Sequence, residues 1–342
     1  MVTMVDIAKK AGVSQATVSR VLNGKGSTAR ISASTQKRVQ AIARRLQFHP
    51  SFAGQALVRG RTRSIGFMCG NIRNPHYTDM ADAAMEAVEQ RGYHLVMAVT
   101  RWFSWENDLE CFDGLLARGV DGVIYFGNAL APATPQYERV VRERFPLVSI
   151  SYQVPGLPCI LSDNQPGMDE AFALLKANGH TRIIGIRSEA PEKRIPFLTA
   201  AAKYGFEVEE GPPLASDGPR RDEQTLLEVR QEAHRFAERK DRPTAVFVSS
   251  DFLAAAFICG LWEKGVMIPR DVSVFSYDGT QAGEVMAPPL TSVTQDAPEI
   301  IRRALKIIFD RIERDETPNP APVEMVPTRL VIRQSIGPNI KI

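Results

Sequence analysis

The chain has 342 residues, enough for two or three domains, and a hydrophobic fraction of 44% that is ordinary for a protein with a buried core. No apolar run approaches the ~20 residues of a membrane span, and the N-terminus lacks the apolar core of a signal peptide, so we expect a cytoplasmic protein without a membrane partner. Four cysteines and five histidines are scattered without metal-ligand spacing, so we expect no metal, no cofactor and no disulfide framework.

Charge is distributed very unevenly along the chain. Residues 1–63 contain twelve Lys or Arg and a single acid, Asp6, which gives a net charge of +11. The remaining residues contain thirty Lys or Arg and 38 acids, which gives −8. A short basic segment on a mildly acidic body is the electrostatic pattern of a nucleic-acid-binding domain attached to another domain.

The first predicted elements are two short helices joined by a tight turn. Thr3 and Asp6 have the spacing of a capping box at the start of the first helix. Gly12 ends that helix, and Ser14 caps a second one that runs from Gln15 to about residue 23. Two short helices joined in this way form a helix-turn-helix, whose second helix enters the major groove of DNA by its N-terminal end.

Two groups of side chains on this second helix and its cap have chemistry suited to DNA. The residues that face away from its buried stripe and are predicted to contact base edges are Gln15, Ala16 and Arg20. The short hydroxyls predicted to contact phosphates are Ser14, Thr17 and Ser19. A generic helical hairpin with exposed polar residues is the alternative, but the surrounding positive charge favours DNA binding.

A third helix is predicted after Ser32, from residue 33 to about 46, and its basic side chains are either phosphate contacts or simply solvated. The segment 51–60 follows Pro50. It is so short that a helix there would be marginal in water on its own.

The sequence resembles the lactose-repressor (LacI/GalR) family of bacterial transcription regulators. The segments that carry the resemblance are 5–8, 11–14, 17–23, 49–50, 56–57, 61–66 and 327–333. The resemblance implies a helix-turn-helix DNA-binding domain over residues 1–48, a hinge helix and linker over 49–63, and an effector-binding and dimerisation domain over 64–342. The implied fold is a small all-α head on an α/β body of two doubly wound lobes, like a periplasmic binding protein.

The resemblance also implies that the hinge folds into a helix on the operator, with Ala53 and Leu57 at the minor groove. Leu57 would be an apolar wedge that kinks the duplex, and an ordinary linker residue is the alternative. Gly54 weakens such a helix by about 1 kcal/mol relative to alanine, which leads to the hypothesis that hinge folding depends on DNA or effector. The loop over residues 24–30 is about three residues longer than is usual in the family.

Beyond residue 63, apolar strand-like runs alternate with helical stretches. The predicted strands are at 65–68, 94–99, 120–126, 147–150, 183–186, 245–248 and 272–275, and helices are predicted at 80–90, 108–117 and 167–178. Alternation of this kind indicates parallel sheets, and two such cycles indicate two doubly wound lobes.

Ligands of open α/β sheets bind beyond the carboxyl ends of the strands, which selects particular loops of the body. Together with the family positions, this gives the predicted effector-binding residues His76, Tyr77, Ser151, Tyr152, Asp163, Lys193, Arg194, Ser250, Asp251, Asp278 and Gln295. Acids accept hydroxyl hydrogen bonds, aromatic faces cover C–H groups, and a basic residue anchors an oxygen or an anion. Helix capping by Asp251 and plain packing of Tyr152 remain alternatives.

The cleft departs from the family pattern at its expected anchor. Lys193 occupies the position of the effector-binding arginine and Pro196 that of a glycine, while Arg194 would substitute after a shift of one residue. Lysine lacks the planar fork of arginine, and Ser250 stands where the family often has asparagine. The expected effector is therefore a sugar, a sugar acid or a related polar metabolite.

Two other functions compete with a regulator. The chain has no dinucleotide fingerprint, P-loop or nucleophile elbow, which opposes an enzyme, and its basic head opposes a periplasmic transport component. We therefore expect a transcriptional regulator, a repressor, that binds a near-palindromic operator as a homodimer and responds to a small molecule. The absence of a C-terminal heptad helix favours a dimer over a tetramer.

Overall fold

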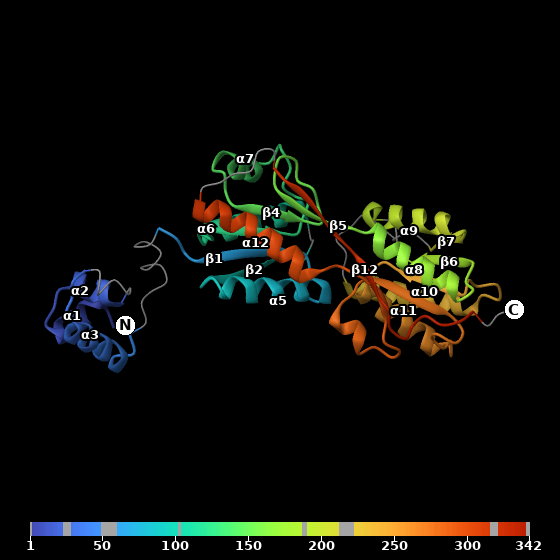
Figure 1. The fold of residues 1–342 in the computed structure, drawn as a ribbon, viewed down its shortest axis with the longest axis horizontal. Coiled ribbons are helices and arrows are strands. Elements are labelled where there is room, and N and C mark those ends of the chain that lie inside the picture. Colours follow the sequence, from blue (N-terminus) through green and yellow to red (C-terminus); the bar gives the residue numbers. More distant parts are fainter. Residues whose placement is uncertain are drawn as a thin grey trace. The chain divides into compact units, whose positions relative to one another are not determined.

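The computed structural model describes residues 2–22, 29–48, 60–101, 104–186, 190–211, 222–314 and 321–339. The chain divides into two compact units, Met1–Thr62 and Arg63–Ile342 (Figure 1). The predicted hinge residues Ala53, Gly54 and Leu57 and most of the long loop at 24–30 lie outside the described residues, so their roles remain sequence predictions. Within the described part, no helix has the length and apolar character to cross a membrane.

The first unit contains the predicted helix-turn-helix and a third helix. These helices are α1 (Met4–Ala11), α2 (Gln15–Leu22) and α3 (Ala33–Arg45). Thr3 and Asp6 form the predicted capping box, and Gly12 ends α1 in the left-handed conformation, with φ 64° and ψ 40°. The three helices bury a common core that includes Ile7, Val18 and Val39, so the tight turn is fixed by packing as well as by its caps.

The N-terminal lobe of the second unit is a parallel sheet between two layers of helices. Its strands are β1 (Ser64–Cys69), β2 (His94–Val99), β3 (Gly122–Tyr125), β4 (Leu147–Ile150), β5 (Cys159–Asp163) and β11 (Val323–Pro327), in the order β11-β5-β4-β3-β1-β2. One core cluster joins a sheet face to α5 (Pro75–Glu89) and α12 (Ala297–Arg314). The other joins the opposite face to α6 (Trp105–Ala117) and α7 (Pro135–Arg142).

The C-terminal lobe repeats this arrangement around a second sheet. Its strands are β6 (Arg182–Ile186), β7 (Glu207–Glu210), β8 (Ala245–Val248), β9 (Ser273–Asp278), β10 (Thr291–Thr294) and β12 (Arg329–Val331), in the order β12-β10-β9-β8-β6-β7. Helices α8 (Gln165–Ala177) and α9 (Pro191–Tyr204) cover one face, and α10 (Asp222–Glu238) and α11 (Asp251–Glu263) cover the other. A short 3₁₀ helix, η1 (Gln281–Glu284), follows β9.

The chain crosses between the two lobes three times, from β5 to α8, from β10 to α12 and from β11 to β12 (Figure 1). The predicted two-lobed α/β class is confirmed, with one departure: β12 pairs antiparallel with β10 at the edge of its sheet. Both sheets place the carboxyl ends of their central strands at the junction of the lobes, which is where a ligand of such a fold binds.

Candidate functional site

The exposed side of α2 carries the side chains predicted to read DNA. Gln15, Ala16 and Arg20 are all exposed, whereas Val18 and Val21 on the same helix are buried. The helix is therefore held by its apolar side and presents a glutamine, a methyl group and a guanidinium on the other. These three groups have the chemistry to pair with adenine, thymine and guanine in the major groove.

The start of α2 is organised by hydroxyl groups. The Thr17 amide donates to Ser14 Oγ over 3.1 Å, and the two hydroxyl oxygens lie 2.9 Å apart. Ser14 is exposed, while Thr17 and Ser19 are half-buried. A capped helix N-terminus with nearby hydroxyls provides donors of the kind that bind a phosphate.

A cavity of about 950 Å³ opens between the lobes of the second unit. It lies beyond the carboxyl ends of the strands, and its walls include Asn74 at the start of α5, the loop after β4, the start of α9 and the ends of β8 and β9. The structure brings nine of the predicted effector residues into its lining. They are His76, Tyr77, Ser151, Tyr152, Asp163, Lys193, Ser250, Asp278 and Gln295.

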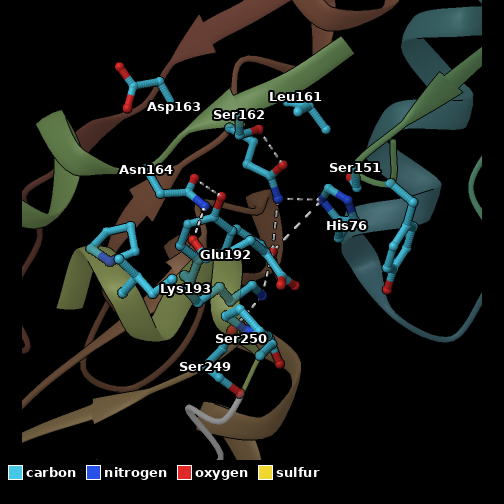
Figure 2. Close-up of a pocket in the computed structure, with 18 of the residues that line it drawn as sticks. His76, Ser151, Leu161, Ser162, Asp163, Asn164, Glu192, Lys193, Ser249 and Ser250 are labelled. Atoms are coloured by element: carbon cyan, nitrogen blue, oxygen red, sulfur yellow. Dashed lines mark hydrogen bonds and ion pairs between the residues drawn. The ribbon is translucent and has the colours of Figure 1, made fainter. Parts of the chain in front are cut away.

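The centre of the cavity is a polar cluster around the Asp278 carboxylate, and this cluster includes the side chains of His76 and Lys193, which Figure 2 labels. Gln295 Nε2 donates to Asp278 Oδ1 over 3.2 Å, and Lys193 Nζ lies 3.7 Å from the same oxygen. Burial raises the pKa of Asp278 to about 6, although the nearby Lys193 ammonium lowers it. Asp278 has φ 112°, a backbone conformation that L-residues seldom adopt and that is typical of strained functional positions.

Lys193 is held by three different groups on the C-terminal lobe. Its Nζ donates to the Ser249 carbonyl over 2.7 Å and lies 4.2 Å from the centroid of the Tyr277 ring. The ammonium therefore supports the Asp278 carboxylate from a fixed position. A lysine held in this way donates single hydrogen bonds and lacks the paired donors of an arginine.

His76 connects the N-terminal lobe to this cluster. Its Nδ1 lies 3.4 Å from Gln295 Nε2 and 3.9 Å from Asp278 Oδ1. Burial lowers the pKa of His76 to about 4, so the imidazole is neutral near pH 7 and forms no ion pair with Asp278. Ser162 Oγ donates to Gln295 Oε1 over 2.8 Å, which fixes the amide that bridges the two lobes.

Several lining residues were not predicted from the sequence. Asn164 Nδ2 donates to the Glu192 carbonyl over 2.7 Å, and the Tyr277 hydroxyl donates to Asn164 Oδ1, which ties the start of α9 to the β5–α8 crossover. Asn74 accepts a 3.1 Å bond from the His76 amide as the cap of α5. The Asn-Pro start of that helix was the signal available for Asn74.

Two predicted effector residues do not line the cavity. Arg194 pairs instead with Glu210 at the end of β7. Asp251 is completely buried and accepts hydrogen bonds from Ser276, Ser292 and Thr280, so it joins β9, β10 and η1. The cap of α11 is Ser250, which accepts from the Leu253 amide, so the contacts of Asp251 are those of a link between strands and not those of the helix cap given as the alternative.

Asp163 lines the cavity, but its carboxylate points away from Lys193 (Figure 2). Its Oδ1 accepts a 3.2 Å bond from the Gln165 amide at the start of α8. Among the described residues, no group of His, Cys, Asp or Glu side chains is arranged to hold a metal ion. The cavity therefore has the chemistry of a polar binding site built from hydrogen-bonding groups and aromatic rings.

Both the helical head and the two-lobed body match known protein families. Residues 3–51 match the bacterial regulatory proteins of the lacI family, and residues 172–336 match a periplasmic binding protein-like domain. The HTH-type transcriptional regulator DegA of Bacillus subtilis is 32% identical over 306 residues, which cover 87% of this chain and 88% of that protein.

Solved structures share the fold over the whole chain. The lac repressor dimer bound to operator and the anti-inducer ONPF has a TM-score of 0.79 at 21% identity, with 98% of each chain covered. The complex of the transcriptional regulator CelR with cellobiose has a TM-score of 0.64 at 24% identity, covering 98% of this chain and 100% of that one. The helical head and the two-lobed body are therefore a known combination.

Proposed function

The chain belongs to the lacI family of bacterial regulatory proteins, and from this membership we propose that it is a repressor whose operator binding is controlled by a sugar or sugar derivative. Its relative DegA is a transcriptional regulator rather than an enzyme. The observation that carries the proposal is the presence in one chain of a capped, basic helix-turn-helix and a polar cavity between two lobes.

The DNA-reading part of the proposal rests on α2. Gln15, Ala16 and Arg20 contact base edges, and Arg20 provides the strongest discrimination because a bidentate arginine–guanine pair contributes about 1–3 kcal/mol. Ser14, Thr17 and Ser19 contact phosphates and fix the position of the helix. The +11 charge of residues 1–63 supplies affinity that is independent of sequence and falls steeply with salt.

The effector part rests on the Asp278 cluster. Carboxylate, amide, imidazole and hydroxyl groups converge there beside Tyr77 and Tyr277, which suits a ring that carries several hydroxyl groups. The solved complex of the regulator CelR with cellobiose supports a sugar-like ligand for this chain. Lys193 supports Asp278 and donates to one ligand oxygen.

The proposed coupling between the cavity and the DNA relies on contacts that cross the cleft. His76 and Asp278 belong to different lobes and meet through Gln295, and Arg73 pairs with Glu223 over 3.0 Å between β1–α5 and α10. A ligand that replaces or tightens such contacts changes how the lobes close. In the homodimer, that change decides whether paired hinge segments, with Ala53 and Leu57, fold in the minor groove.

The DNA part is tested by selection of binding sites from a randomised duplex library, using the full chain and two variants. The wild type should enrich a near-palindromic motif, and Arg20→Ala should lose preference at one position of each half-site. Arg44→Ala, on α3, is the matched control and should leave the enriched motif unchanged. Enrichment of no motif by the wild type would contradict sequence-specific binding, and an unchanged motif with Arg20→Ala would remove Arg20 from the base contacts.

The effector part is tested separately by thermal shift with sugars, sugar acids, sugar phosphates and nucleosides. A sugar should raise the melting temperature of the wild type and leave that of Asp278→Ala unchanged. A shift that persists in Asp278→Ala would place the ligand outside this cluster.

A further inference from the structure

The cavity has an apolar side that the Asp278 cluster does not use. Leu161 on β5, Met325 on β11, Ile195 on α9 and Tyr152 after β4 all contribute to its walls. Three of these side chains are among the exposed large hydrophobic residues of the described chain: Ile195 is 62% exposed, Met325 49% and Tyr152 37%. Single exposed apolar residues are normal on a surface, but several around one cavity indicate a surface that a ligand covers.

Strand register explains how this apolar side is formed. Leu161 and Met325 are paired across β5 and β11, so their side chains lie on the same face of the sheet. Their neighbours Ile160 and Val326 point to the other face and are buried in the core beneath α5 and α12. Because β11 and β5 form one edge of this sheet, the pair lies at the margin of the lobe.

Helix geometry separates the apolar side from the polar cluster. Lys193 and Ile195 are two residues apart on α9, which places them roughly 200° apart around the helix axis. Lys193 contacts Ser249 and Tyr277 of the C-terminal lobe, whereas Ile195 is exposed, and both residues line the cavity. The cavity therefore extends around the start of α9 from a polar end to an apolar end.

We propose that the ligand is amphipathic: a hydroxyl-rich ring at the Asp278 end joined to an aryl or alkyl substituent that lies against Ile195, Leu161 and Met325. A glycoside with an apolar aglycone has this chemistry. The volume of about 950 Å³ is near the upper end of the range for sites that enclose drug-sized ligands, which leaves room for both parts. The inference rests on the proposed function, because it extends a ligand that binds at Asp278.

The test uses calorimetric titration of the full chain with matched methyl and phenyl glycosides of glucose, galactose, mannose and xylose in both anomeric forms. For the sugar that binds, the phenyl glycoside should bind about tenfold more tightly than the methyl glycoside, because the ring covers apolar surface now exposed to water. Ile195→Ser and Met325→Ser should each reduce this gain, measured in each variant as the ratio of the methyl to the phenyl dissociation constant.

Ile332→Ser is the matched control, since Ile332 is 64% exposed and does not line the cavity, and it should keep the full gain. Equal affinity for methyl and phenyl glycosides, or a gain that survives both cavity variants, would overturn the amphipathic ligand and leave the proposed function intact. Binding of free sugars but of no glycoside would also overturn the amphipathic ligand and leave the proposed function intact. Failure of every sugar and glycoside to bind would overturn the sugar effector itself.

Discussion

The buried carboxylate of Asp251 holds the C-terminal lobe together beside the cavity, and replacement of Asp251 by alanine or asparagine tests this structural role. Its Oδ1 accepts hydrogen bonds from the hydroxyls of Ser276 and Ser292, the latter over 2.6 Å. Its Oδ2 accepts from the amide and the hydroxyl of Thr280 over 2.7 and 2.8 Å. One side chain at the start of α11 thus connects β9, β10 and η1.

The expected loss of stability follows from these four donors. Each of the four hydrogen bonds contributes about 1 kcal/mol net, and leaving the buried Thr280 amide without an acceptor costs a further 1–3 kcal/mol, so Asp251→Ala should lower the free energy of unfolding by about 5–7 kcal/mol. Asp251→Asn keeps one oxygen for the Thr280 amide, and the serine hydroxyls can turn to accept from its NH₂ group. Its loss should be about 1–2 kcal/mol.

The pH dependence has a definite sign. Burial raises the pKa of Asp251 above its ordinary value of 3.8, so the folded protein binds this proton more tightly than the unfolded chain does. The stability that Asp251 contributes therefore falls as pH rises above about 4. The asparagine of Asp251→Asn does not titrate, so the difference in free energy of unfolding between the wild type and this variant should become smaller as the pH rises above about 4.

Urea unfolding followed by circular dichroism measures these differences. Asp169→Ala is the control, because Asp169 is a surface acid paired with Lys203 over 2.7 Å, and it should change stability by at most ~1 kcal/mol. A loss below ~1 kcal/mol for Asp251→Ala would refute the structural role. Loss of ligand binding with unchanged stability would instead return Asp251 to the effector site.

Three further predictions concern the cavity and the head. Ligand affinity should fall about tenfold between pH 7 and pH 5 in calorimetric titrations, because protonation of Asp278, whose pKa is about 6, removes a hydrogen-bond acceptor. Asp278→Asn should make ligand affinity independent of pH over this range. A wild-type affinity that does not change with pH would contradict the role of Asp278 as an acceptor. Lys193→Ala should weaken ligand binding at least about tenfold, whereas Arg194→Ala, which changes a side chain outside the lining, should alter it less than about twofold, and the reverse order would make Arg194 the anchor. Gly12→Ala should destabilise the helix-turn-helix by about 1 kcal/mol, because φ is 64° there, and weaken DNA binding in anisotropy titrations; an unchanged melting temperature and affinity would show that the turn tolerates a side chain.

Local signals predicted the head and the strand pattern well. The spacing of Thr3, Asp6 and Gly12 specifies caps that depend on only a few neighbouring residues, and the structure has these caps where they were predicted. The buried, mostly apolar run Leu147–Ile150 likewise forms a strand with the predicted bounds. Features that depend on contacts between near neighbours can be recognised without the fold.

Features that depend on distant contacts were harder to predict. Helix α9 contains Pro196 within it, so its sequence gives a poor helix signal even though its Phe197 is buried in the lobe. Edge strand β11 joins the first sheet after the chain has passed through the second lobe, which only tertiary packing determines. By contrast, β2, the strand at the other edge of this sheet, was predicted from the sequence, even though its edge position leaves it partly exposed.

The candidate cavity was predicted in outline, since loops after parallel strands converge at one edge. The assignments of Lys193 and Arg194 illustrate the limit, because adjacent helical residues point about 100° apart and the sequence alone does not fix which one faces the cleft. Asp251 shows a second limit. An acid at the start of a helix after a strand has the same local sequence whether it contacts a ligand or neighbouring strands.

In the proposed mechanism, occupancy of the cavity controls DNA binding by the head. The most direct measurement is the fluorescence anisotropy of a duplex carrying the selected motif, titrated with the full chain with and without a saturating cavity ligand found by thermal shift. If occupancy of the cavity controls the head, the ligand should change DNA affinity by a factor of about 5–150, and Asp278→Ala should abolish this change while keeping DNA affinity. Equal DNA affinity with and without the saturating ligand would contradict it.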